Sequence, residues 1–393
     1  MTASNVPPAG ILYHAPVYGA SGYADENLLV LMALGERGLP VQLLARGRQS
    51  DSEKLLPVEM RRELARMQQS RVDPGRSIFY QCVPGNDFNL DMAGRCNIGR
   101  TTFETDSIPD GWAENCAEFD EIWVPSEFNR ETFARNGVDE RKLRVMPEGI
   151  DTGLFHPGCT PLPIPERRGF AFLSVFDWQQ RKGPDVLLRA FADEFQADED
   201  VSLVLKVTTI NHPWLDVEAW LAWFLERELH VSLDAVPPII LLNGLLPRAD
   251  LPRLYAAADA FVLPTRGEGW GRPYGEALAC ERPVIATRWG GQLDFLDDGN
   301  SDLIDIEGIV PTPTDLDLEV FAGHAWAQPS VEHLRQLMRH VFRHPEEAAA
   351  KAHRGRRDMV EKWDGRRVAS LFADEFERLL DGVAVRQVAG GKA

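Results

Sequence analysis

The residues best suited to chemistry gather in one short segment, residues 265–276, with the sequence TRGEGWGRPYGE. Its glycines permit tight turning and close approach to a ligand, and Pro273 suits the first turn of a helix. The amino end of a helix offers unpaired N–H groups and a partial positive charge, which favour a diphosphate. Glu268 in the loop and Glu276 in the first helical turn can accept hydrogen bonds from sugar or ribose hydroxyls. The alternative is a plain turn with Glu276 complementing the helix dipole.

A second group follows an earlier apolar run. Arg181 and Lys182 precede Gly183 and Pro184, and we expect Asp185 to be the N-cap of the next helix. Two adjacent cations suit a phosphate, and ligands of open α/β sheets bind outside the carboxyl ends of the strands. This loop and the Glu268 loop are therefore expected to face one pocket, although an isolated Arg-Lys pair is more often a solvated surface feature.

A third, weaker element is the small-residue turn Gly19-Ala20-Ser21-Gly22, between the first strand-like run and the first helical pattern. Small residues there let the backbone approach a ligand. The turn lacks a full GxGxxG pattern, and no acidic residue closes a second strand about twenty residues further on. This argues against a dinucleotide site of the dehydrogenase kind.

These loops belong to a regular alternation of short apolar runs with longer amphipathic segments, which predicts an α/β protein with parallel sheets covered by helices. A linker rich in Pro and Gly is expected at residues 149–168, and residues from 329 onward are predicted to be helical. The predicted strands are residues 10–15, 41–45, 77–82, 95–102, 121–125, 143–146, 170–175, 201–207, 239–242, 260–264 and 283–286.

The amino-acid composition bears on which partners the chain can bind and on where the protein is found. The 393 residues include 42 Lys and Arg against 60 Asp and Glu, a net charge of −18, which opposes binding to nucleic acid. Five scattered cysteines, no secretory signal and no apolar stretch of about 20 residues predict a cytoplasmic protein. Residues 54–71 form a basic amphipathic pattern, either an ordinary surface helix or a weak peripheral contact with the inner face of an anionic membrane.

Four stretches together resemble glycosyltransferase family 4, which has the GT-B fold: VPSEFNRETFARNGV, VMPEGIDTGLFHP, RKGPDVLLRAF and GEGWGRPYGEALACERPVIAT. The most specific feature is the pair Glu268 and Glu276, separated by seven residues. The resemblance implies two Rossmann-like domains facing each other across a cleft. We expect an acceptor-side domain at residues 1–162, a donor domain at residues 163–362, and a C-terminal helix at residues 363–393 that returns to the first domain.

The resemblance also implies an activity: transfer of a sugar, with retention at the anomeric carbon, from a nucleotide diphosphate sugar to a hydroxyl of a glycan, lipid-linked saccharide or small molecule. Glu268, Arg181 and Lys182 would be catalytic, with the cations on the diphosphate, and UDP or GDP would be the nucleotide. No metal or other cofactor is expected. The residues expected to bind the donor are Gly19, Ser21, Gly22, Gly244, Leu245, Leu246, Gly269, Gly271, Arg272, Pro273, Tyr274 and Glu276.

Two departures from the family pattern stand out. Many members carry an Arg just after the strand before the RKG loop, whereas this chain has Asp177 and Trp178 there. Glu104 and Thr105 stand where other members often carry a cleft-facing His, so Glu104 is predicted either to contact the acceptor or donor sugar or to be a loop carboxylate. The alternatives to a transferase are another GT-B enzyme, such as an epimerase or phosphorylase, and a catalytically silent nucleotide-sugar binder. The oligomeric state stays open.

Overall fold

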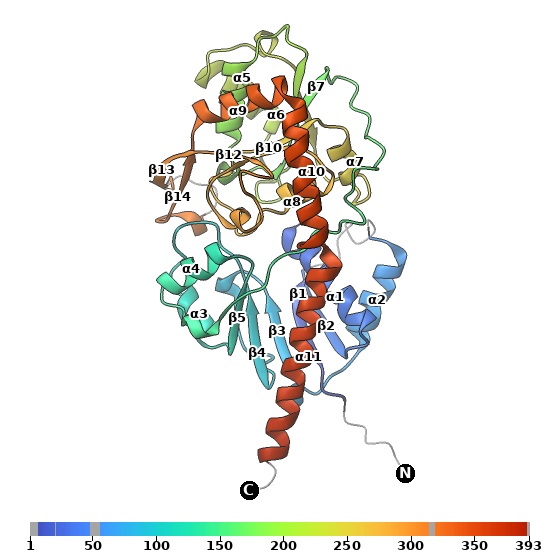
Figure 1. The fold of residues 1–393 in the computed structure, drawn as a ribbon. Helices are drawn as coiled ribbons and strands as arrows, with labels where there is room; N and C mark the ends of the chain where they lie inside the picture. Colours follow the sequence, from blue (N-terminus) through green and yellow to red (C-terminus); the bar gives the residue numbers. More distant parts are fainter. Residues whose placement is uncertain (1–6, 20, 48–55, 314–318, 391–393) are drawn as a thin grey trace. The chain divides into compact units, whose positions relative to one another are not determined.

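The computed structural model describes residues 7–19, 21–47, 56–313 and 319–390 (Figure 1). They form two compact units, which are described separately. Unit 1 comprises the residues up to Phe103, Ser107–Gly149 and the residues from Trp363 on. Unit 2 comprises Ile150–Lys362 together with the short segment Glu104–Asp106.

Unit 1 contains a six-stranded sheet in the order β2-β1-β3-β4-β5-β6, in which every neighbouring pair is parallel. Its strands are β1 (Ile11–Pro16), β2 (Val41–Arg46), β3 (Ile78–Cys82), β4 (Cys96–Arg100), β5 (Glu121–Val124) and β6 (Leu143–Val145). Its helices are α1 (Gly22–Glu36), α2 (Val58–Gln69), α3 (Trp112–Ala117), α4 (Glu127–Arg135) and α11 (Gly365–Gly390). Helix α11 lies beside α1 (Figure 1). Its Phe372 and Phe376 pack on Trp123 of the sheet.

Unit 2 contains a second parallel sheet in the order β12-β11-β10-β7-β8-β9. Its strands are β7 (Phe170–Asp177), β8 (Val201–Thr208), β9 (Ile239–Asn243), β10 (Ala260–Leu263), β11 (Val284–Thr287) and β12 (Asp302–Ile304), with an antiparallel pair β13 (Ile306–Pro311) and β14 (Ala325–Pro329). Its helices are α5 (Pro184–Glu194), α6 (Val217–Trp223), α7 (Leu251–Ala256), α8 (Arg272–Ala279), α9 (Val331–Arg343) and α10 (Pro345–Glu361).

The two parallel sheets with helices confirm the predicted α/β class, and each predicted strand corresponds to an observed one. Strands β12, β13 and β14 were not predicted. Strand β13 alternates between half-buried and exposed residues, so it lacks the continuous apolar run that marks a strand buried on both faces.

The prediction that Asp185 caps α5 is wrong. Gly183, with φ +70°, occupies the N-cap, and Pro184 begins the helix. Asp185 instead binds Arg266 through two contacts of 2.9 and 2.7 Å.

Within the amphipathic stretch at residues 54–71, Val58–Gln69 form α2, and residues 54–55 lie outside the described residues. Across the described part of the chain, no helix combines the length and apolar character that crossing a membrane requires.

Candidate active site

The loops that carry the predicted site residues meet because of the strand order in unit 2. Strand β7 lies beside β10 at the centre of the sheet, and the chain builds outward from β7 to β9 on one side and from β10 to β12 on the other. Such a switch point opens a crevice at the carboxyl ends of the two central strands. Arg181 and Lys182 follow β7 in a single 3-10 turn (Gln180–Lys182), and Glu268 follows β10.

Backbone contacts hold these two loops against each other. The carbonyl of Arg181 accepts a hydrogen bond from the Arg266 amide at 2.6 Å and from the Thr265 hydroxyl at 3.2 Å. Gly183 lies so close to β10 that a Cβ atom there would stand 2.1 Å from the carbonyl oxygen of Pro264. A side chain at 183 would therefore force the loops apart.

The structure brings Arg181, Lys182, Glu268 and Glu104 into one cluster, which we call the switch-point cluster. Lys182 Nζ lies 2.6 Å from Glu268 Oε1, and Arg181 Nη1 lies 3.4 Å from Glu268 Oε2. Arg181 Nη2 lies 3.3 Å from Glu104 Oε1, and Arg181 also donates to the carbonyl of Gly267. Arg181 and Glu268 side chains are each 7% exposed, whereas Glu104 is 20% exposed.

Burial and the neighbouring cations act in opposite directions on the pKa values of the two glutamates in this cluster. Burial raises the pKa of Glu104 above its usual value, and the attraction of Arg181 only partly offsets this. Burial also acts to raise the pKa of Glu268, but Lys182 and Arg181 outweigh it, so its pKa is lowered. Burial and the adjacent Arg181 lower the pKa of Lys182. The site thus holds one carboxylate that its cations stabilise and one that burial disfavours.

Glu104 reaches this cluster through a segment bound to unit 2. The Asp106 amide donates to the carbonyl of Ala325 in β14 at 2.9 Å, and the Ala325 amide donates to Asp106 Oδ1 at 2.8 Å. The Glu104 carbonyl oxygen packs on Gly267, where a Cβ atom would stand 1.9 Å from it. The space beside this glycine is therefore filled by the chain's own backbone, and neighbouring Thr105 is fully buried.

Helix α8 begins at Arg272 after Gly271, and Pro273 lies in its first turn. The prediction that Glu276 lies in the first turn is wrong, because Glu276 is the fifth residue of the helix. It is 5% exposed and accepts a hydrogen bond from the Tyr255 hydroxyl at 3.0 Å. Tyr274 is fully buried and its hydroxyl donates to the carbonyl of Leu263 at 2.6 Å, so this side chain anchors the helix to β10.

The predicted donor-binding residues Gly244, Leu245 and Leu246 lie after β9, at the same edge of the sheet. The Gly244 amide donates to the carbonyl of Val207 at 3.1 Å, and Leu245 is 51% exposed. Lys206 of β8 donates to the carbonyls of Gly244 and Val207, and burial lowers its pKa to about 8. The turn that includes Leu246 is thereby tied to the end of β8.

In unit 1, Ser21 is the N-cap of α1, and its hydroxyl accepts a hydrogen bond from the Ala24 amide at 3.2 Å. Gly19 has φ +148°, and Gly22 is the first residue of the helix. Ala20 lies outside the described residues. The turn therefore has the predicted place between a strand and a helix.

One polar residue at the carboxyl edge was noted in the sequence only as a departure from a family pattern. Asp177 accepts hydrogen bonds from Thr208 Oγ1 at 2.8 Å, the Ile210 amide at 2.7 Å, Asn211 Nδ2 at 2.7 Å and Gln179 Nε2 at 3.1 Å. Burial acts to raise its pKa, but these hydrogen bonds outweigh it and the pKa is lowered. Asp177 thus joins the loop before Arg181 to the loop after β8. Its place at the carboxyl end of a strand was the available signal.

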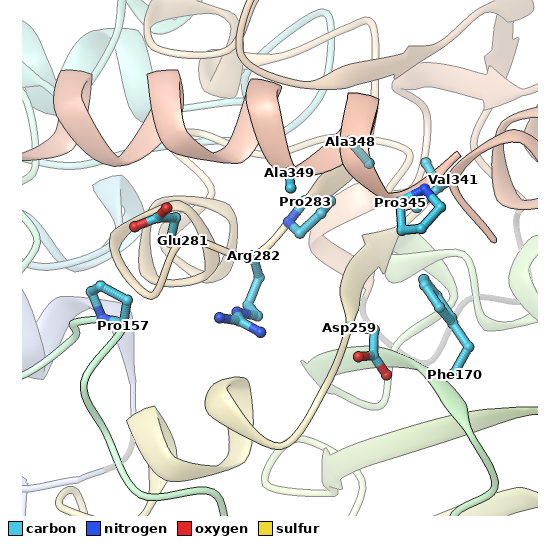
Figure 2. A pocket seen from close by; sticks show the side chains of 10 residues that line it. All are labelled: Pro157, Phe170, Asp259, Glu281, Arg282, Pro283, Val341, Pro345, Ala348 and Ala349. Atoms are coloured by element: carbon cyan, nitrogen blue, oxygen red, sulfur yellow. The ribbon is translucent and has the colours of Figure 1, made fainter. Parts of the chain in front are cut away.

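A cavity of about 340 Å³ lies at the opposite edge of the unit 2 sheet (Figure 2). Phe170 begins β7, while Asp259 and Pro283 directly precede β10 and β11. Figure 2 shows these residues facing Ala348 and Ala349 of α10. The cavity is therefore at the amino ends of the strands, away from the switch-point cluster. Within the described ranges, no three His, Cys, Asp or Glu residues gather in a way that could hold a metal ion.

Two Rossmann-like units, each with a six-stranded parallel sheet, define the GT-B class, and solved structures support this fold. HepE from Anabaena, in complex with UDP and glucose, aligns with a TM-score of 0.63 at 15% identity over 94% of this chain and 99% of its own. Sucrose-phosphate synthase from Thermosynechococcus elongatus aligns with a TM-score of 0.65 at 16% identity over 95% and 96% of the two chains.

Sequence comparisons show which proteins of this class the chain resembles. Residues 167–317 match the family described as Glycosyl transferases group 1. A D-inositol 3-phosphate glycosyltransferase of Acidothermus cellulolyticus is 30% identical over 43% of this chain and 38% of its own length. A GDP-mannose-dependent phosphatidylinositol monomannoside mannosyltransferase of Mycolicibacterium smegmatis is 27% identical over 66% and 63%. The chain thus spans less than two thirds of the length of these relatives. These matches show that residues 167–317 resemble group 1 glycosyltransferases.

Proposed function

We propose that this protein is a retaining glycosyltransferase that moves a sugar from a nucleotide diphosphate sugar to a hydroxyl acceptor. The observation that carries the proposal is the meeting of Arg181, Lys182 and Glu268 at the switch point of the unit 2 sheet. The names of the relatives support the reaction class, since the mycolicibacterial relative is GDP-mannose-dependent and the HepE structure contains UDP and glucose.

The roles of the cations follow from where negative charge develops during sugar transfer. Cleavage of the bond between sugar and phosphate leaves growing negative charge on the diphosphate, and fixed cations aimed there stabilise the transition state more than the ground state. Arg181, Lys182 and the amino end of α8 supply that positive potential. This compensation comes from the protein itself, so the proposed mechanism uses no metal or other cofactor.

Two carboxylates bind the hydroxyl groups of the donor. Glu268, kept ionised by Lys182, accepts hydrogen bonds from the donor sugar, and Glu276 accepts them from the ribose of UDP or GDP. Gly269 and Gly271 precede α8, Arg272 begins it, and all three bind the donor. The turn at Gly244–Leu246 faces the base. The acceptor is a hydroxyl of a glycan, lipid-linked saccharide or small molecule.

The test is a screen of UDP- and GDP-sugars with the purified chain, measuring release of free nucleoside diphosphate with and without sugar alcohols as acceptors. Glu268→Gln is expected to reduce turnover at least 100-fold, as loss of a group acting in the transition state does. Glu166→Gln, an exposed carboxylate of unit 2, is the matched control. Nucleotide binding without turnover would instead identify a silent binder, and an inverted product anomer would contradict retention.

A further inference from the structure

Arg181 donates to the carbonyl of Gly267, but it pairs with carboxylates less closely than a buried guanidinium usually does. Its two carboxylate contacts are 3.3 and 3.4 Å, longer than the 2.7–2.9 Å that is typical, by rough central values, of charge-assisted hydrogen bonds. Its Nε is buried without a hydrogen-bond partner. The guanidinium therefore retains capacity for a stronger anionic partner.

Glu104 and Glu268 differ in what else binds them. Glu268 has Lys182 at 2.6 Å and stays paired if Arg181 turns to another anion. The carboxylate of Glu104 pairs with Arg181 at 3.3 Å, and its pKa is raised by burial. Of the two carboxylates, Glu104 is thus the weaker partner, and it is also the more exposed one.

The backbone keeps Glu104 where it is. The packing of the Glu104 carbonyl on Gly267 and the Asp106–Ala325 hydrogen bonds fix the main chain at this residue and just after it. A diphosphate arriving at Arg181 can displace the carboxylate group by side-chain rotation, but the negative charge stays within a few ångströms. At such separations in a partly buried site, repulsion between like charges lowers affinity substantially.

We propose that Glu104 is a competing carboxylate that occupies Arg181 in the absence of nucleotide and speeds nucleotide release after transfer. This inference rests on the proposed function, because the competing ligand is the diphosphate of the donor or of the product. Glu104 acts through Arg181, and its predicted contact with a sugar is not needed for this role.

The experiment measures binding of UDP and of GDP to the full chain by calorimetry, and their dissociation rates by stopped flow. Glu104→Gln, nearly identical in shape, is expected to bind the nucleotide about 10-fold more tightly, with the change in the dissociation rate. Glu104→Asp, which keeps the charge, should bind close to wild type, as should the control Glu166→Gln. A general structural defect would weaken nucleotide binding, whereas removal of a competing charge strengthens it. The sign of the change in affinity therefore separates these two causes.

Equal or weaker binding by Glu104→Gln, with UDP or GDP bound by the wild type, would overturn this inference and leave the proposed function standing. Tightening by Glu104→Asp as large as that by Glu104→Gln would also overturn it, because charge would then be irrelevant. If neither nucleotide binds any variant or the wild type, the proposed function itself fails.

Discussion

Each unit buries an arginine against a glutamate, and the two pairs differ in how completely they are satisfied. In unit 1, Arg100 Nη2 lies 2.5 Å from Glu26 Oε1, its Nη1 donates to the carbonyl of Met146 at 2.7 Å, and its guanidinium lies over the ring of Phe372. In unit 2, Arg181 likewise donates to a carbonyl, that of Gly267, and lies over the ring of Phe321, but its carboxylate contacts are longer and its Nε has no partner. Close pairing identifies a contact that maintains the fold, and loose pairing leaves binding capacity for a ligand.

The largest expected effect tests the unit 1 pair. Arg100→Met is expected to lower the free energy of unfolding by about 3–5 kcal/mol, because Glu26 would remain buried without its partner. Chemical denaturation measures the change, and the exposed Arg141→Met serves as a control without a measurable effect. Adding Glu26→Leu to Arg100→Met should recover most of the loss. A cost below about 1 kcal/mol would show that close pairing does not mark a structural role.

The next effect tests the unit 2 cluster through catalysis. Lys182→Met is expected to reduce kcat by roughly 30- to 1000-fold, or about 2–4 kcal/mol of transition-state stabilisation, while the unfolding midpoint changes little. Steady-state kinetics on the best donor measures it, with Lys362→Met as an exposed control. A raised KM at unchanged kcat would mean that Lys182 binds ground state and transition state equally.

The smallest effect tests the two carboxylates of the cluster by their pH dependence. The folded-state pKa of Glu268 is lowered, so its ionisation stabilises the fold above about pH 4.5, and this contribution is lost as pH falls through the folded pKa. The folded-state pKa of Glu104 is raised, so its ionisation costs stability once pH rises above about 4.5 and through the folded pKa. Thermal unfolding at pH 4–8 should find Glu268→Gln less stable and Glu104→Gln more stable than wild type near neutral pH.

The Glu104 difference should shrink as pH falls toward 4, where this carboxylate becomes protonated, whereas the Glu268 difference should shrink only below about pH 4.5, as pH falls through its lowered folded-state pKa. Shifts of the same sign for the two variants at neutral pH would contradict the assignment of one stabilised and one disfavoured carboxylate.

The sequence predicted the fold class and strands β1 to β11 because apolar runs bounded by Gly and Pro are a local signal. It also predicted that the Arg181 loop and the Glu268 loop share a pocket, because parallel strands bring their carboxyl ends to one edge. The structure brings Lys182 and Glu268 to 2.6 Å. These inferences needed only short segments and general rules of sheet topology.

What the sequence did not predict depends on tertiary contacts. Glu104 follows β4 in the chain but pairs with Arg181 in unit 2, and no local pattern encodes that pairing. Asp185 has the side chain of an N-cap, yet Gly183 fills that position because the backbone must pass close to Pro264. Tyr255 and Glu276 likewise meet only after α7 and α8 are both in place.

The close approach of Gly183 to Pro264 has a consequence for engineering. The cation-bearing turn and the glutamate-bearing turn share one rigid support, so a substitution that reshapes either of them will displace the other. Attempts to change donor preference by randomising one loop alone should mostly yield inactive proteins. Libraries that vary both loops together while keeping position 183 as glycine have the better prospect of retaining activity.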